Sequence, residues 1–201
     1  MKVTLIQQTP NAVEMISEIA SICYDSNPAN PMALVRHLYN SGHHSVFEHI
    51  YFTFKIEGIS RACSHQLVRH RMCSFTQRSQ RYCSEDKFEF VTPPTVNDCV
   101  FANDMDEIQN WYEYHIYHGA PKEDARYLLP NACCTELYLS CNLRELIHIA
   151  NERLCTRAQW EIREVVKQMC ALVDERLHFM LVPKCKSGLL ICNNKCGKET
   201  V

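Results

Sequence analysis

Alternating apolar and polar residues indicate where the chain forms strands. In residues 50–57 the apolar side chains recur at every second position, the pattern of a strand with one buried face: Ile50, Phe52, Phe54 and Ile56. Residues 2–7 alternate in the same way, and residues 88–91 predict a further short strand. Residues 132–141 fit either a strand or a helix. The chain is therefore expected to contain a small sheet.

Other segments carry the signals of helices. Thr9-Pro10 and Asn30-Pro31 each place a proline at a favourable first helical position, so a helix is expected after each, the second ending at Gly42. Helices are also predicted over residues 59–70, 104–118, 142–153 and 156–179, with a short one from Pro121 that ends before Pro130. Asn142 and Glu145 resemble a capping box. This irregular mixture predicts an α+β fold, a mixed sheet with flanking helices in a single-domain subunit.

Length and composition set limits on the class of protein. The 201 residues are 46% hydrophobic, which suits one domain over residues 1–182, followed by a Cys/Lys-rich tail over residues 183–201. The formal charge of −2 argues against a surface that coats nucleic acid. An odd total of 13 cysteines favours reduced thiols in a cytoplasmic protein. We expect no membrane span, because no apolar stretch is long enough.

The five glycines exclude two common nucleotide-binding motifs. They lie at least 9 positions apart, so neither G-x-G-x-x-G nor G-x-x-x-x-G-K-[ST] is present. Any phosphate must therefore be held by side chains.

Residues 61–81 form an arginine-rich segment. It holds five of the twelve arginines, and no Asp or Glu occurs between Gly58 and Ser84. Arginine binds phosphate and carboxylate through a planar pair of donors. Two interpretations stay open for the segment alone: an anion site, or a solvated basic loop that pairs with acidic residues elsewhere. More arginines are spread over the C-terminal half: Arg126, Arg144, Arg153, Arg157 and Arg163.

Histidines and cysteines offer weaker alternatives. His43, His44 and His49 lack the spacing of a metal-binding helix, so no metal is predicted. The tail cysteines Cys185, Cys192 and Cys196 fit a zinc site or a reduced tail. A nucleic-acid or zinc-binding module that uses residues 61–81 and this tail is therefore the alternative function. The absence of aromatic residues between most of the arginines counts against nucleic acid.

Four short motifs follow one another along the chain. They are G-H-H-S-V-F-E-H at residues 42–49, R-H-R-x-x-S-x(4)-S-x-R-Y at residues 69–82, A-R-Y-L-L-P at residues 125–130, and N-L-R at residues 142–144 with Arg153 and A-Q-W-E-I at residues 158–162. In this order and spacing they resemble the motifs of the flavin-dependent thymidylate synthases, from about residue 23 to residue 162.

The resemblance implies a fold and an activity. Members of this family are mixed α/β subunits that form homotetramers, with FAD sites built from several subunits. They make dTMP from dUMP, with methylenetetrahydrofolate as carbon donor and NADPH as reductant of the flavin. The family uses no covalent cysteine, so Cys133 and Cys134, which follow Pro130, are not expected to be nucleophiles.

The resemblance also implies roles for single residues. The positions that match FAD contacts are Ser45, Arg69, His70, Arg71, Gln77, Asn142, Leu143, Arg144 and His148. The positions that match dUMP contacts are Gln66, Leu67, Val68, Arg69, Gln77, Arg78, Ser79, Gln80, Arg81, Arg126 and Arg153. Arg153 is the expected catalytic residue, because its family position faces the uracil N3 edge, where a guanidinium stabilises negative charge on the ring. Some members have Glu at Gln77, Asn at Thr76 and Asn at His148, which leaves those contacts open.

Overall fold

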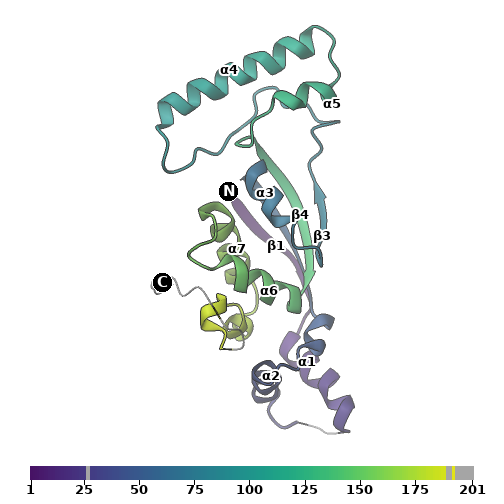
Figure 1. Cartoon of the computed structure of the whole chain (residues 1–201). Helices are drawn as coiled ribbons and strands as arrows, with labels where there is room; N and C mark the ends of the chain where they lie inside the picture. The colour runs from purple at the N-terminus through teal and green to yellow at the C-terminus, as the bar shows by residue number, and fades with distance from the viewer. Residues whose placement is uncertain (26–27, 189–191, 193–201) are drawn as a thin grey trace.

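A small antiparallel sheet is the centre of the molecule. The computed structural model describes residues 1–25, 28–188 and 192. Within these residues four strands form one sheet in the order β1-β2-β4-β3 (Figure 1). The strands are β1 (Lys2–Gln8), β2 (Tyr51–Ser60), β3 (Ser74–Gln77) and β4 (Cys134–Asn142). Each neighbouring pair is antiparallel, with Phe54 of β2 opposite Leu5 of β1 and Leu139 of β4.

Helices and short 3-10 turns connect the strands. The α-helices are α1 (Ala12–Ser21), α2 (Pro31–Asn40), α3 (Arg61–Leu67), α4 (Asp98–Tyr117), α5 (Lys122–Ala125), α6 (Leu143–Arg153) and α7 (Trp160–Leu172). The 3-10 turns are η1 (Ile22–Tyr24), η2 (Ser45–His49), η3 (Arg126–Leu128), η4 (Glu175–Met180) and η5 (Lys184–Lys186). None of the helices in the described ranges is long and apolar enough to cross a membrane.

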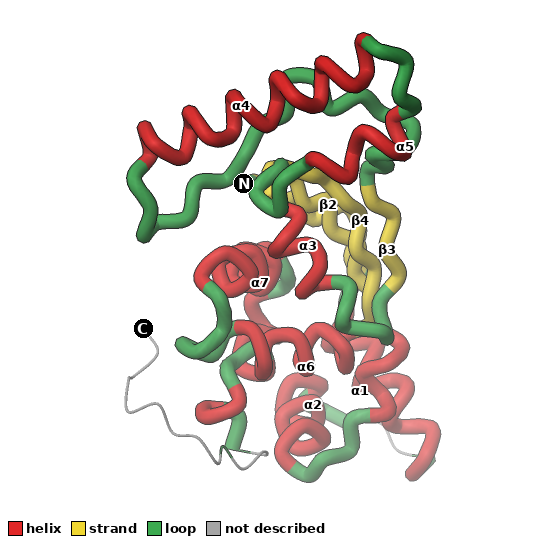
Figure 2. The backbone as a smooth tube through the Cα atoms, turned by 45° about the horizontal axis from the view of Figure 1, so that its top comes forward, coloured by secondary structure: helices red, strands yellow, loops and turns green. Residues whose placement is uncertain are grey.

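One face of the sheet carries the main core. Helices α3, α6 and α7 pack on this face, while α1 and α2 lie at one end of the sheet and α4 and α5 at the other (Figures 1 and 2). The apolar positions of β2 predicted from its alternation are buried here, together with Leu137 and Leu139 of β4 and the inner side of α6 and α7. Burial of such side chains away from water is the main stabilising contribution. A smaller apolar cluster around Phe88, Met105 and Cys133 supports α4.

The fold agrees with the predicted α+β class and differs in several elements. The sheet is antiparallel in its pairings rather than mixed. Residues 132–141, which fit either a strand or a helix by sequence, contain most of strand β4 (Cys134–Asn142). The predicted strand at residues 88–91 is reduced to one bridge, between Phe90 and Cys133. Strand β3 was not predicted, because it is short and polar.

Helix ends account for the remaining differences. The helix predicted over residues 59–70 is α3, which ends at Leu67 and continues as a turn in which the His70 amide donates to the Leu67 carbonyl. The helix predicted over residues 156–179 is interrupted: Val173 is extended after α7, and Asp174 caps the 3-10 turn η4. Of the predicted tail, Cys185 and Cys192 are described, whereas Cys196 lies outside the described residues.

Candidate active site

Arg153 and His70 are in direct contact although they lie 83 positions apart in the sequence. Arg153 ends helix α6, and His70 lies in the turn after α3. The Nε of Arg153 donates a hydrogen bond to the Nε2 of His70 at 3.0 Å, and a terminal guanidinium nitrogen lies 3.5 Å from the Gln66 carbonyl oxygen. These contacts hold one edge of the guanidinium and leave its remaining donors for a ligand.

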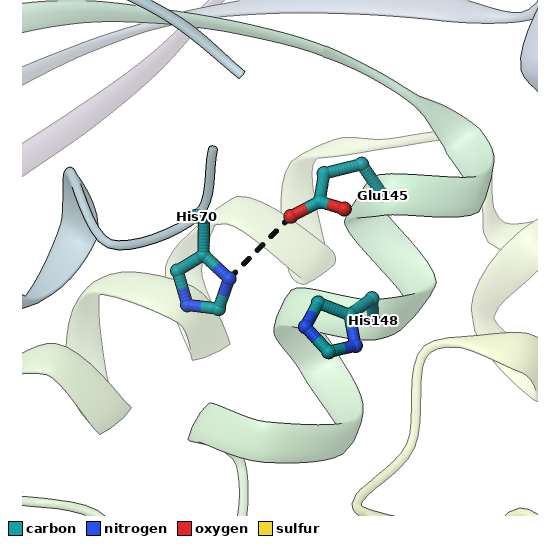
Figure 3. A group of neighbouring side chains, drawn as sticks. All are labelled: His70, Glu145 and His148. Atoms are coloured by element: carbon teal, nitrogen blue, oxygen red, sulfur yellow. Dashed lines mark ion pairs between the residues drawn. The ribbon is translucent and has the colours of Figure 1, made fainter. Parts of the chain in front are cut away.

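Glu145 completes this cluster from the first turn of α6. Its Oε1 lies 3.4 Å from the Nδ1 of His70, as Figure 3 shows. His70 and Glu145 are both more than nine-tenths buried. The Asn142 side chain accepts a hydrogen bond from the Glu145 amide at 2.9 Å, as the predicted capping box requires. The Glu145 carboxylate faces His70 instead of closing the other half of the box.

Burial sets the charge state of His70. Burial contributes most, and together with the nearby charges of Arg153 and His148 it lowers the pKa of the imidazole to about 4. His70 is therefore neutral near pH 7. Its Nε2 accepts from Arg153, so its proton is on Nδ1, facing Glu145. Burial disfavours the charged form of Glu145 as well, and so raises the pKa of that carboxyl group.

His70 and Glu145, together with His148, have the residue types of a metal site. Ligand atoms of His70, Glu145 and His148 lie within 4.8 Å of one another. However, both ring nitrogens of His70 already have protein partners, and one partner is the cationic Arg153. A metal ligand must offer a lone pair and tolerate the ion's charge, so this donor set suits an oriented guanidinium better than a cation.

A second cluster joins Arg81 and Arg126. Arg81 forms an ion pair with Glu123, with Nε 2.6 Å from Oε2, and Arg126 Nε donates to the Glu123 backbone carbonyl at 3.1 Å. The Arg81 guanidinium also lies over the ring of Tyr82, 5.3 Å from its centroid. The Ser79 hydroxyl accepts the Arg81 amide at 3.2 Å. Glu123 thus holds two arginines close together, and their guanidinium groups form a site that can bind phosphate.

Other predicted substrate residues are bound within the protein. Gln77 donates to the hydroxyls of Ser64 and Thr135 at 3.0 and 3.2 Å. Arg78 pairs with Glu85 at 3.3 Å, and the buried Gln80 donates to the Cys133 sulfur at 3.7 Å. In this conformation these side chains connect the arginine-rich segment to Thr135 of β4, to Glu85 and to Cys133.

A cavity of about 390 Å³ lies beside the His70 cluster. Its lining residues are Tyr39, Gly42, His44, Arg144, Ile147, His148, Asn151 and Ser187. His148 belongs to both places, since its ring meets that of His70 edge-on at 5.6 Å. Among the described residues, the buried Tyr39 hydroxyl and the Asn151 Oδ1 have no hydrogen-bond partner. Unpaired buried polar atoms are costly, so a polar ligand in this cavity is expected.

The remaining predicted cofactor residues lie around these two sites. Arg144 pairs with Glu48 of the 3-10 turn η2, which packs on α6, and Ser45 begins that turn at the surface. Arg69, Arg71 and Val68 are exposed in the turn after α3. Two predicted contacts have fully buried side chains, Leu67 and Leu143. The backbone amide of Leu143 is also used, since it donates to the Ile50 carbonyl at 2.7 Å.

The paired cysteines after Pro130 are poor nucleophiles. Burial raises the pKa of Cys133 to about 12 and that of Cys134 to about 11. A thiol must lose its proton to attack, so neither is activated here.

Four residues of these sites were missed by the sequence analysis. Glu145 was interpreted as a helix cap, and Glu123, Tyr39 and Asn151 were not singled out. A local pattern does not mark them: Glu145 and Glu123 contact side chains from other segments, and Tyr39 and Asn151 are brought to one cavity by the fold.

Comparisons with known proteins agree on one family. The family described as Thymidylate synthase complementing protein matches residues 4–177. A flavin-dependent thymidylate synthase of Geobacter sulfurreducens is 42% identical over 190 residues, covering 86% of this chain and 82% of the relative. The enzymes of that name from Clostridium tetani and Pyrococcus horikoshii are 34% and 39% identical, over 94% and 88% of this chain and 89% and 80% of their own.

A solved structure has the same fold. Thymidylate synthase X from Helicobacter pylori, crystallised with FAD and dUMP, aligns with a TM-score of 0.80 and 23% identity, over 92% of this chain and 99% of that one. At this identity the likeness establishes the fold. These relatives give no support to a nucleic-acid or zinc-binding module.

Proposed function

The chain belongs to the flavin-dependent thymidylate synthase family, and from that premise we propose that it converts dUMP to dTMP with bound FAD. The observation that carries the proposal is the Arg153–His70–Glu145 cluster, in which the partly exposed Arg153 is held by the buried His70, and which His148 connects to the cavity. A fixed guanidinium beside a ligand cavity is what charge stabilisation on a pyrimidine ring requires.

The cavity fits a flavin nucleotide by its donor set. Arg144 offers planar donors to a diphosphate, and the unpaired Tyr39 hydroxyl and Asn151 oxygen suit the polar edge of a ring. Matching family motifs assign the cofactor contacts to Ser45, Arg69, His70, Arg71, Gln77, Asn142, Leu143, Arg144 and His148. Burial and existing contacts suggest two changes to that list. Leu143 lies in the core, and both ring nitrogens of His70 are engaged, so His70 acts on the ligand through Arg153. When bound, FAD supplies the redox chemistry.

The chain's own side chains bind and polarise the nucleotide. Arg81 and Arg126, both held by Glu123, bind the dUMP phosphate. Arg153 directs its free donors at the N3 and O4 edge of uracil. As negative charge builds on the ring, the guanidinium stabilises it, and C5 becomes the nucleophile that accepts the carbon. The permanent charge of arginine suits this role, since it does not titrate near pH 7.

We further propose methylenetetrahydrofolate and NADPH as co-substrates and a homotetramer with shared sites, in the cytoplasm. Large apolar side chains on the surface near the arginine-rich segment and α4 support the assembly: Met72, Tyr82, Tyr114, Tyr117 and Tyr127. Exposed apolar groups of this kind mark protein interfaces. The catalytic domain is proposed over residues 1–182, because the described core extends to Leu181.

Complementation tests the shared sites. If Arg71 and Arg153 reach one site from different subunits, mixing inactive Arg71→Ala and Arg153→Ala proteins restores part of the activity. Mixed oligomers that recover no activity indicate sites contained within one subunit.

The absorption spectrum of the purified protein tests the flavin. We expect a yellow protein that releases FAD on denaturation, or a colourless one that binds added FAD. A folded protein that binds no FAD and instead binds polynucleotide in a salt-dependent manner would favour the nucleic-acid module.

A further inference from the structure

We propose that Glu145 is a positioning residue that holds Arg153 in its working orientation through His70. The inference rests on the proposed role of Arg153 and adds a residue that the family motifs do not include. Its basis is the unbroken chain of contacts from the Glu145 carboxylate to His70 Nδ1 at 3.4 Å and from His70 Nε2 to Arg153 Nε at 3.0 Å.

The hydrogen bonds allow one arrangement of protons. Arginine Nε can only donate, so His70 Nε2 must accept and the imidazole proton must be on Nδ1. A carboxylate oxygen facing Nδ1 stabilises that tautomer. The other tautomer would place two N–H groups against each other and turn the guanidinium away.

The fold makes this chain of contacts rigid. Glu145 lies in the first turn of α6 and Arg153 at the end of the same helix, so their separation is fixed by the helix itself. His70 comes from the turn after α3 and bridges the two ends. The His70 ring and the Glu145 carboxylate are buried, and the exposed His148 ring contacts His70 edge-on. Little room is left for His70 to rotate.

A merely structural role predicts different behaviour. Helix α6 is capped by the Asn142 side chain, and Glu145 contributes only its backbone amide to that cap. The Glu145 carboxylate is therefore free to act on His70. Removing it is expected to change the orientation of Arg153 more than the start of the helix.

Three substitutions of Glu145 separate the effect of its side-chain length from that of its negative charge. Glu145→Gln keeps an oxygen at the same reach, so we expect turnover within about 3-fold of wild type. Glu145→Leu removes the acceptor, and we expect about 10- to 100-fold slower single-turnover dTMP formation at saturating dUMP, with FAD still bound. Glu145→Asp keeps the charge but withdraws it by one methylene, so its rate falls below that of Glu145→Gln. Glu18→Leu on the exposed side of α1 is the matched control and leaves the rate unchanged.

A spectroscopic measurement reads the tautomer without turnover. In protein labelled with ¹⁵N-histidine, two-bond ¹H–¹⁵N spectra report which ring nitrogen carries the proton, and His70→Asn assigns the signal. We expect Nδ1–H in wild type and Glu145→Gln, and a loss of this preference in Glu145→Leu. If Glu145→Leu does not fold, the order of Gln above Asp in rate decides instead.

The outcomes separate this inference from the proposed function. Wild-type rates together with an unchanged Nδ1–H signal in Glu145→Leu, or Asp outperforming Gln, would overturn the positioning role. A wild-type holoenzyme that makes no dTMP overturns the proposed function, while the tautomer measurement still decides whether Glu145 fixes His70.

Discussion

Replacing Arg153 by lysine keeps the positive charge and removes its fixed orientation. Arginine contacts His70 through Nε and keeps its terminal donors for the ligand. Lysine has a single nitrogen, which reaches His70 or the uracil edge but not both. A hydrogen bond that involves a charged group contributes about 1.5–3 kcal/mol. If that contribution is expressed in the transition state, Arg153→Lys slows the chemical step by about 10- to 150-fold.

Single-turnover dTMP formation at saturating dUMP measures this loss. FAD content and reduction of the flavin by NADPH are expected to match wild type, which confines the defect to the step at the pyrimidine. Arg157→Lys, at an exposed arginine four residues further along the chain, is the matched control with an unchanged rate. If Arg153→Lys reaches the wild-type single-turnover rate, Arg153 only binds substrate and the mechanism proposed above is wrong.

Three further predictions use the same structure. Glu161→Ala removes the acceptor of the Ser60 amide and hydroxyl, at 2.7 and 2.5 Å, and is expected to lower the free energy of unfolding in urea by about 2–5 kcal/mol. Burial and Arg153 lower the pKa of His70 to about 4, so on acidification the unfolded chain takes up this proton before the folded chain does. The free energy of unfolding therefore falls as the pH drops below about 6.5. His70→Asn is expected to reduce this fall, measured as a smaller difference between the urea midpoints at pH 7 and pH 5.5. Arg126→Lys should weaken dUMP binding about 5- to 30-fold in calorimetry with little change in single-turnover rate, because it loses a planar phosphate contact.

The sequence predicted those strands and helices that carry a local signal, such as alternation or a helix cap. Strand β2 follows from alternation, and the start of α6 follows from its cap at Asn142. Strand β3 lacks such a signal, because its four residues are mostly polar and it forms by pairing with β4, as Ser74 does with Ser140. The end of α7 at Leu172 was likewise missed, since Val173 turns away in an apolar stretch that still suits a helix.

The candidate site was predictable as a set of residues and not as a geometry. Motifs identified Arg153 and His70 separately, but the contact between them spans 83 positions and depends on the fold. Glu145 was seen only as a cap, because its carboxylate partner comes from another segment. The unpaired oxygens of Tyr39 and Asn151 become visible only when α2 and α6 enclose a cavity.

Product formation from dUMP tests the central claim most directly. The purified protein with bound FAD is incubated with dUMP, methylenetetrahydrofolate and NADPH, and nucleotides are separated by chromatography. We predict dTMP that appears only when all three are present and that is lost when FAD is stripped and restored when it is returned. A folded protein that retains FAD yet forms no dTMP, or forms it equally well without FAD, would contradict the account.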